Sequence, residues 1–348
     1  MDMRNLSRRT FVQLTTATSM SFIAAPAICA SAKWRPDDPI VGEGEHTYEA
    51  VHDWLAPPSK AFAFGDTHGL CQDSAGRIYL AQTVHASSEK PDAVLVFDDA
   101  GKFITSWGAE FRGGAHGLDL RREGADEFLY HCDTNRRLVV KTTLDGEVVW
   151  ERGVPTESGK YADPNRWRPT NVAFAPNGDL FVGDGYGSSY IHRYDKDGKY
   201  LRTIGEPGSG EGQMSCPHGL WVDDRDASNP MLVVADRSNN RLQYFTLDGA
   251  HNRFVTTDIR QPCHFKLRGD LMLIPDLASV VMLLDRENRV VAKLGDGQPS
   301  NLRGAARDQF VPGKFIHPHD AIFLANGRDI LVAEWVPIGR VTLLRKVS

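Results

Sequence analysis

Three histidines at almost equal intervals are the residues of this sequence best suited to carry chemistry. His116 and His218 are 102 residues apart, and His218 and His319 are 101 residues apart. Each follows Ala or Pro and opens a short segment that reads as a strand. Three neutral imidazoles that converge leave an open position for water or substrate, which is typical of a catalytic rather than a structural zinc site. The spacing therefore predicts a tris-histidine metal site, provided that the fold brings the three positions together.

The elements that must position these histidines form an internal repeat. Six segments contain an apolar strand, most of them ending in an acidic residue, and several are followed by an Asp-Gly turn of the kind that joins antiparallel strands. The repeated strands are residues 77–82, 128–133, 180–184, 232–236, 271–276 and 330–334. Six four-stranded units of roughly 50 residues predict an all-β fold, a six-bladed β-propeller. The first strand of every blade lines the central channel, so histidines in blades two, four and six should meet there.

The last repeat is one strand short. The chain ends soon after the strand that begins at Val341, and the strand-like segment 47–54 precedes the first repeat. We expect this segment to close the ring by completing blade six. The propeller should then be a single domain over residues 46–348, preceded by a linker at 33–45.

The first 32 residues read as a twin-arginine export signal. Arg8 and Arg9 precede a moderately apolar run that ends in the small residues Ala30-Ser31-Ala32. The sequence therefore predicts a periplasmic or secreted protein that the twin-arginine machinery exports after folding. A net charge of −5 without a Lys/Arg block lacks the electrostatic footprint of a nucleic-acid binder. The sequence contains no run of 18 apolar residues, so it predicts no membrane anchor. We expect a monomer.

Other residues lie at the same position of the repeat as the three histidines. His68 does so in blade one, and Cys263 or His264 in blade five. They could enlarge the metal site or only cap strands, and the second interpretation is favoured. Most of the cysteines are expected to be small buried hydrophobes rather than disulfide partners, because no local spacing suggests a pair.

The chain resembles the NHL-repeat propellers, and more narrowly the peptidyl-α-hydroxyglycine α-amidating lyases. The segments that carry the resemblance are 169–174, 180–186, 217–220, 234–243 and 318–320. The lyases cleave α-hydroxyglycine peptides to amides and glyoxylate at a zinc ion. The resemblance implies that His116, His218 and His319 are zinc ligands. It also implies that Tyr186 is catalytic, that Arg237 holds the substrate carboxylate, and that Asp320 binds a structural calcium ion.

Three departures from the lyases change what the resemblance implies. Residues 61–68 contain no counterpart of the second substrate-binding arginine, and the cysteines of both family disulfides are missing. His317 stands where the lyases have a methionine, two residues before the third histidine, and adds a candidate catalytic group. We therefore expect a related reaction on a small molecule with a hydroxyl and a carboxylate.

Three functions remain open on the sequence alone. The first is a metal-dependent lyase, with zinc as the expected cofactor and iron, copper or manganese as alternatives. Its partners would be a small-molecule or peptide substrate and the export machinery. The second is a metal-dependent hydrolase or lactonase with His317 or His68 as base. The third is a non-catalytic propeller that binds a protein or cell-wall partner on its top face. An exposed patch of Trp and Arg would favour it, and the loop residues Trp167, Trp221 and Trp335 are candidates for that patch.

Overall fold

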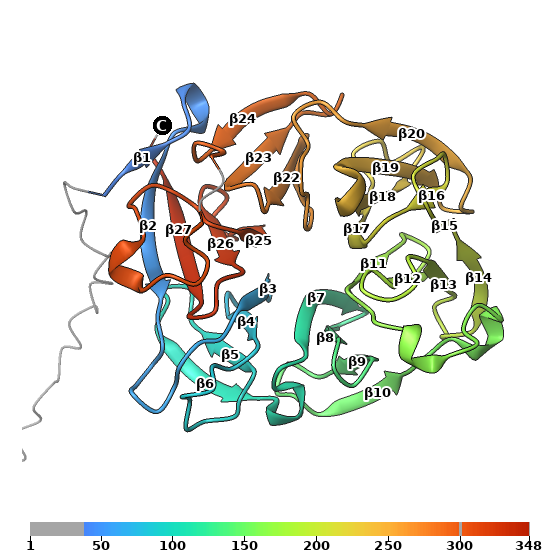
Figure 1. The fold of residues 1–348 in the computed structure, drawn as a ribbon, viewed down its shortest axis with the longest axis horizontal. Coiled ribbons are helices and arrows are strands. Elements are labelled where there is room, and N and C mark those ends of the chain that lie inside the picture. The colour runs from blue at the N-terminus through green and yellow to red at the C-terminus, as the bar shows by residue number, and fades with distance from the viewer. Residues whose placement is uncertain (1–37, 299–300, 348) are drawn as a thin grey trace, which may run out of the picture. The chain divides into compact units, whose positions relative to one another are not determined.

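The computed structural model describes residues 38–298 and 301–347, which lie within one compact unit, residues 34–348. Six antiparallel sheets surround a central channel, with the innermost strands β3, β7, β11, β17 and β25 nearest the axis (Figure 1). The predicted six-bladed β-propeller is thus confirmed. The predicted export signal, residues 1–32, lies outside the described residues.

Each of the first three blades is a four-stranded sheet in which neighbouring strands are consecutive in the chain. Blade one contains β3 (Thr67–Gln72), β4 (Ile78–Gln82), β5 (Val94–Phe97) and β6 (Phe103–Trp107). Blade two contains β7 (Ala115–Glu123), β8 (Asp126–Asp133), β9 (Leu138–Thr142) and β10 (Val148–Arg152). Blade three contains β11 (Asn171–Phe174), β12 (Leu180–Gly183), β13 (Ile191–Tyr194) and β14 (Tyr200–Ile204).

Blades four and five repeat this plan. Blade four contains β17 (Pro217–Asp223), β18 (Met231–Asp236), β19 (Arg241–Thr246) and β20 (His251–Val255). Blade five contains β21 (Lys266–Arg268), β22 (Leu271–Asp276), β23 (Val280–Leu284) and β24 (Val290–Leu294). A short parallel pair, β15 (Glu206–Pro207) and β16 (Gln213–Met214), lies between blades three and four in the chain.

The helical turns are short 3₁₀ segments between strands. They are η1 (Gly44–His46), η2 (Ala109–Phe111), η3 (Thr156–Ser158), η4 (Pro164–Arg166), η5 (Arg237–Asn239) and η6 (Arg307–Gln309). No helix in the described ranges is long and apolar enough to span a membrane.

Blade six is built from both ends of the chain. Its inner strands are β25 (Pro318–Phe323), β26 (Ile330–Glu334) and β27 (Arg340–Lys346), and β2 (Tyr48–Leu55) pairs antiparallel with β27. The N-terminal strand therefore closes the ring, as predicted. A further short strand, β1 (Ile40–Val41), pairs with β2 and lies within the range expected to be a linker.

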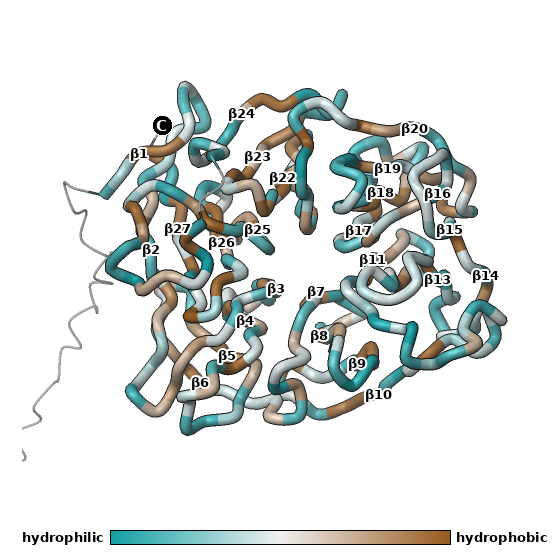
Figure 2. Tube along the Cα trace, viewed as in Figure 1, coloured by the Kyte–Doolittle hydropathy of each residue, from teal (hydrophilic) through white to brown (hydrophobic). Residues whose placement is uncertain are grey.

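Apolar side chains from neighbouring blades pack against one another and hold the ring together. Leu273 and Leu283 of blade five form one cluster with Val332 and Leu344 of blade six, and all four are fully buried. Burial of each such side chain stabilises the fold by about 1.5 to 3 kcal/mol. Hydrophobic residues follow the strands of the blades, whereas many connecting loops are hydrophilic (Figure 2). This ring of inter-blade clusters fixes the innermost strands around the channel.

Candidate metal centre and active site

A β-bulge at the start of an innermost strand displaces each of the three predicted histidines. In blade four the pairing passes from Pro217 with Asp236 to Leu220 with Val234, so β17 has one more residue than β18. The same shift occurs around His116 in blade two and around His319 in blade six. Bulges of this kind re-aim a side chain and are frequent next to active sites.

Glycines that follow two of the histidines let the next blade come close. A Cβ atom on Gly117 would lie 2.4 Å from the carbonyl oxygen of Thr170, and one on Gly219 would lie 2.1 Å from that of Cys263. Nδ1 of His116 lies 2.8 Å from this Thr170 oxygen, and Nδ1 of His218 lies 2.9 Å from the Cys263 oxygen. The His-Gly sequence thus provides both the imidazole and the space for its orienting hydrogen bond.

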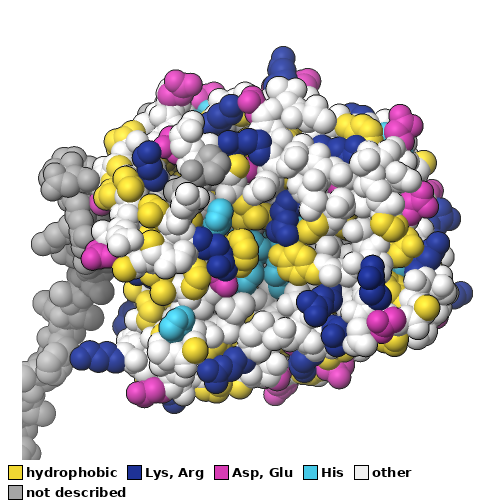
Figure 3. Space-filling model, in the orientation of Figure 1, with side chains coloured by type: hydrophobic (Ala, Val, Ile, Leu, Met, Phe, Trp, Pro, Cys, Tyr) yellow, Lys and Arg dark blue, Asp and Glu magenta, His cyan; other side chains and the backbone are white. Residues whose placement is uncertain are grey.

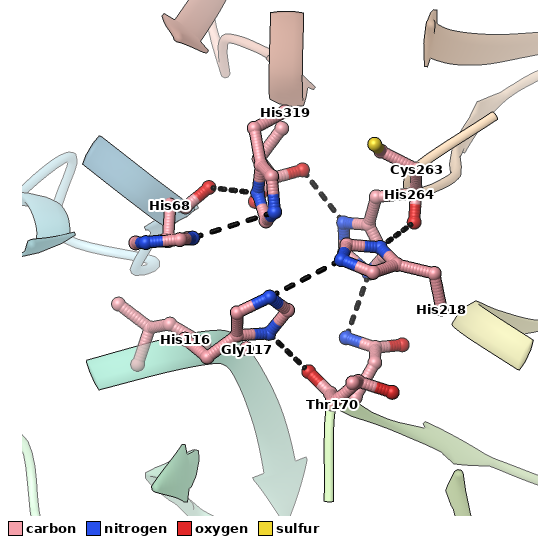
Figure 4. Close-up of a pocket in the computed structure, with 12 residues that line it drawn as sticks. His68, His116, Gly117, Thr170, His218, Cys263, His264 and His319 are labelled. Carbon is pink, nitrogen blue, oxygen red and sulfur yellow. Dashed lines mark hydrogen bonds and ion pairs between the residues drawn. The ribbon is translucent and has the colours of Figure 1, made fainter. Parts of the chain in front are cut away.

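The three imidazoles converge in the channel. Their ring centroids are 4.8 Å apart for His116 and His218, 4.9 Å for His116 and His319, and 4.8 Å for His218 and His319. Figure 4 shows them approaching one another from separate blades. Nε2 of His116 and Nε2 of His218 are 3.1 Å apart. The structure therefore brings together the three residues that the sequence spacing selected.

Hydrogen bonding and burial keep these imidazoles in the form that binds a metal. Each Nδ1 faces a backbone carbonyl oxygen, that of His319 at 3.3 Å from the oxygen of His68. Donation from Nδ1 leaves the Nε2 lone pair free for a ligand, as is usual for metal-binding histidines. Burial lowers the pKa of His116 to about 3 and lowers the pKa of His218 and His319 well below the usual value.

Two further side chains join the cluster. Nδ1 of His68 lies 3.3 Å from Nε2 of His319, and His68, His116 and His319 can each offer a ligand atom within 4.8 Å of the others. His218, Cys263 and His319 form a second such group. The cavity lined by these residues has a volume of about 10 Å³, which suits a single ion or water molecule. The histidine cluster can therefore hold a metal ion.

Tyr186 reaches the same point from the loop after β12. Its phenol oxygen lies 3.1 Å from Nε2 of His116 and 3.0 Å from Nε2 of His218. Asp184 holds the loop by accepting hydrogen bonds from the backbone N–H of Arg168 at 2.7 Å and of Ser188 at 2.6 Å. Burial raises the pKa of Tyr186 to about 12, and the Arg237 guanidinium opposes this rise.

Arg237 follows directly after β18 and lies beside Tyr186. Its Nη1 is 3.5 Å from the phenol oxygen, and its guanidinium carbon is 5.3 Å from the centre of the tyrosine ring. No carboxylate of the described residues forms an ion pair with it. The guanidinium is thus a free cation next to the histidine cluster and can bind an anionic group of a ligand.

Asp320 lines the same cavity as the three histidines and pairs with His264. Its Oδ1 is 2.6 Å from Nδ1 of His264, and its Oδ2 accepts a 2.7 Å hydrogen bond from the backbone N–H of Leu70. Burial alone would lower the pKa of His264, but Asp320 and Asp119 raise it to about 9. Nζ of Lys266 donates to Asp119 at 2.5 Å. His264 and Lys266 thus pair with the carboxylates of Asp320 and Asp119, and calcium binding at Asp320 stays a prediction.

His317 contacts Leu277 and Trp335. Its Nδ1 is 2.8 Å from the carbonyl oxygen of Leu277, and its ring centre is 5.7 Å from that of Trp335. No hydrogen bond among the described residues links it to the three histidines. Trp167, which the binding-propeller alternative placed in an exposed patch, is only 1% exposed and packs in an apolar cluster. That part of the alternative is wrong, because Trp167 fills space between blades two and three.

Sequence reasoning missed Arg303, which lies between β24 and β25 and pairs with Asp66. Its Nη2 donates to Asp66 at 2.7 Å, and its guanidinium carbon lies 3.7 Å from the Trp335 ring centre. Asp66 is two residues before His68, where the missing second arginine was sought. A long loop of irregular structure supplies this cation, so strand spacing could not reveal it. Figure 3 shows Lys and Arg side chains beside the histidines at the centre of this face.

Several known proteins are similar to this chain, although no protein-family model matches it. NHL repeat-containing protein 3 of Mus musculus is 24% identical over 257 residues, which are 70% of this chain and 69% of that protein. Peptidyl-alpha-hydroxyglycine alpha-amidating lyase 1 of Drosophila melanogaster is 26% identical over 281 residues, 72% of this chain and 48% of the lyase. A peptidylglycine alpha-amidating monooxygenase of Rattus norvegicus is 42% identical over 94 residues, 25% of this chain and 9% of that protein. These matches confirm the resemblance seen in the sequence, and the chain spans about half or less of the two amidating enzymes.

Solved structures agree on the fold. A streptogramin B lyase superposes with a TM-score of 0.57 at 13% identity and covers 87% of this chain and all of its own. Virginiamycin B lyase from Staphylococcus aureus gives a TM-score of 0.55 at 14% identity, covering 86% of this chain and 100% of that one. At these identities the similarity establishes the propeller fold alone.

Proposed function

We propose that this protein is an exported, metal-dependent lyase that cleaves the C–N bond of a hydroxylated, carboxylate-bearing substrate. The observation that carries the proposal is the position of the Tyr186 phenol. It lies within hydrogen-bond distance of two imidazoles of the cluster and 3.5 Å from the Arg237 guanidinium, which pairs with no carboxylate in the described part of the chain. A proton-transfer group thus lies between a cluster of candidate metal ligands and an anion-binding group.

The donor set fits a divalent transition metal, with zinc the best candidate. Neutral imidazole nitrogens are common zinc ligands, and three of them leave a position open. His116, His218 and His319 would hold the ion, with His68 beside them. When bound, the ion would supply positive charge that makes a nearby substrate hydroxyl and the Tyr186 phenol more acidic.

Arg237 binds the substrate, and Tyr186 transfers the proton. The Arg237 guanidinium binds the substrate carboxylate and orients the carbon that carries the hydroxyl. The Tyr186 oxygen, as phenolate, takes the proton of that hydroxyl, the C–O bond becomes a carbonyl, and the C–N bond breaks. The same proton then passes from Tyr186 to the departing nitrogen, so the products are an amide or amine and a 2-oxo acid.

Two measurements test this proposal together. Elemental analysis of the exported protein, purified without an affinity tag, should find about one transition-metal ion per chain, and His116→Ala/His218→Ala should lose it. The metal-bound protein should release glyoxylate from an N-acyl-α-hydroxyglycine or a ureido α-hydroxy acid. Absence of metal from the wild-type protein would overturn the proposal. Hydrolysis of lactones, without lyase activity on any α-hydroxyglycine compound, would favour the metallohydrolase instead.

We also propose export through the twin-arginine route, on the basis of Arg8 and Arg9. Replacing both with lysine should leave the protein in the cytoplasm. Cell fractionation and detection of the uncleaved chain would measure this, and normal export of Arg8→Lys/Arg9→Lys would overturn it.

A further inference from the structure

Cys263 differs from the two other fully buried cysteines of the described residues. Cys71 and Cys132 lie in apolar clusters, where a thiol acts as a small hydrophobe. Cys263 is 0% exposed but belongs to none of the apolar clusters, and it lines the histidine-rich cavity instead. Packing alone therefore does not explain a thiol at this position.

The strand register places Cys263 where other blades have a metal-binding histidine. Pro262 bridges to Asp276 in blade five, as Pro217 pairs with Asp236 in blade four. The next residue is His218 in blade four and Cys263 in blade five. The Cys263 sulfur lies within 4.8 Å of ligand nitrogens of both His218 and His319.

The Cys263 sulfur has one cationic neighbour and one weak hydrogen-bond acceptor. Burial raises the pKa of its thiol to about 12, and the Arg237 guanidinium opposes this rise, so the thiolate form requires a bound metal ion. Nη1 of Arg237 lies 4.0 Å from the sulfur and brings a positive charge toward it. The thiol donates to the carbonyl oxygen of Gln261 at 3.8 Å. This hydrogen bond is long, so replacing it with a bond to a metal ion would cost little free energy. The backbone oxygen of Cys263 meanwhile orients His218.

We propose that Cys263 supplies a thiolate ligand to the metal ion held by His218 and His319. This inference rests on the proposed metal centre and adds a sulfur to its nitrogen ligands. On binding, the S–H bond breaks, the proton leaves to solvent, and a metal–sulfur bond forms. A thiolate selects thiophilic ions such as zinc and copper over manganese, magnesium or calcium.

Cobalt(II) substitution tests the ligand directly, without an activity assay. The folded full-length mature protein is freed of metal by a chelator and titrated with Co²⁺, and its absorption spectrum is recorded. Thiolate ligation should give an intense sulfur-to-cobalt charge-transfer band in the near ultraviolet, besides weaker visible bands. Cys263→Ser should bind cobalt and lose the near-ultraviolet band. Cys216→Ser is the matched control, because Cys216 also lies near Arg237 but in neither ligand group, and it should keep the band.

The outcomes separate this inference from the proposed function. Cobalt bound to the wild-type protein without a charge-transfer band would overturn Cys263 ligation and leave the histidine site intact. A band that persists in Cys263→Ser would overturn it as well. Failure of the wild-type protein to bind cobalt or zinc at all would overturn both proposals. A wild-type spectrum without the band overturns the inference even if the Cys263→Ser chain does not fold, and loss of the band in the wild-type protein after alkylation of the thiols would show that a cysteine supplies it.

Discussion

The phenol oxygen of Tyr186 lies 3.0 Å from Nε2 of His218, although the two residues come from different blades. The contact depends on a loop that Asp184 fastens through the backbone N–H groups of Arg168 and Ser188. The imidazole is fixed from its other side by the carbonyl oxygen of Cys263 at 2.9 Å. Both groups are therefore held independently of each other, as the proposed active site would require.

Replacing Tyr186 with phenylalanine should separate proton transfer from metal binding. The Tyr186→Phe variant keeps the ring beside Arg237 and all the histidines but removes the group that moves the proton. We expect unchanged metal content and a turnover number lower by about 10²- to 10⁴-fold. Steady-state kinetics and elemental analysis on the same preparation would check this. Full activity in the variant would remove Tyr186 from the mechanism.

Replacing Arg237 with methionine should mainly weaken substrate binding. A charge-assisted hydrogen bond contributes about 1.5 to 3 kcal/mol, so KM for a carboxylate substrate should rise roughly 10- to 100-fold. An ester or amide analogue without the carboxylate should show much less difference between the variant and the wild-type enzyme. Arg202→Met is a control for loss of charge, because Arg202 is exposed on β14 and donates to the carbonyl oxygen of Asp248. An equal effect on charged and neutral substrates would contradict carboxylate binding by Arg237.

The close approach of blades four and five should make Gly219 intolerant of a side chain. In Gly219→Ala the new Cβ atom would meet the backbone oxygen of Cys263 at 2.1 Å, and a backbone atom cannot swing aside. We expect a loss of stability of more than about 2 kcal/mol and weaker metal binding, because the same oxygen orients His218. Gly304→Ala is the control, since no atom of the described residues lies within 4 Å of its Cβ position. Thermal unfolding with and without metal would measure both effects, and a neutral Gly219→Ala would contradict the close packing.

The repeat in the sequence was sufficient to predict the blades, the closing strand and the histidine ring. Strand periodicity and the intervals between His116, His218 and His319 are properties of the repeat. They can therefore be recognised in the sequence without knowing the conformation of the loops. The sequence did not settle the role of His68, whose imidazole now lies 3.3 Å from that of His319. It also did not show that Asp320 pairs with His264.

Contacts between residues distant in the chain account for these differences. Asp320 is neutralised by His264 of another blade, 56 residues earlier, and strand spacing cannot show which charges meet across a channel. Arg303 comes from the irregular loop before β25, which carries no periodic signal. The bulges that orient the histidines depend on the pairing between strands, which the sequence does not show. The sequence shows only the glycine that follows two of the histidines.

Acid should destabilise the fold through buried neutral histidines, and His131 offers the clearest test. Its ring stacks on Phe111 at 4.7 Å, and its Nε2 lies 3.0 Å from the hydroxyl of Thr142. Burial, with a smaller contribution from Arg136, lowers the pKa of His131 from 6.5 to about 3. Above pH 6.5 the residue is neutral in both the folded and the unfolded chain. As the pH falls below that value, His131 becomes protonated in the unfolded chain. In the folded chain it stays neutral until about pH 3.

The free energy of unfolding should therefore fall by about 1.4 kcal/mol per pH unit for this one residue. Removing the imidazole in His131→Gln should make the decline between pH 6 and 4 shallower by up to that amount, even if the variant is less stable at pH 7. Val139→Ala, on the adjacent strand β9, removes buried volume without a titratable group. It should lower stability by about 1 to 3 kcal/mol at every pH. Urea unfolding of the metal-free proteins across this pH range would measure the slopes, and identical slopes for His131→Gln and the wild-type protein would show that His131 is protonated in the folded chain.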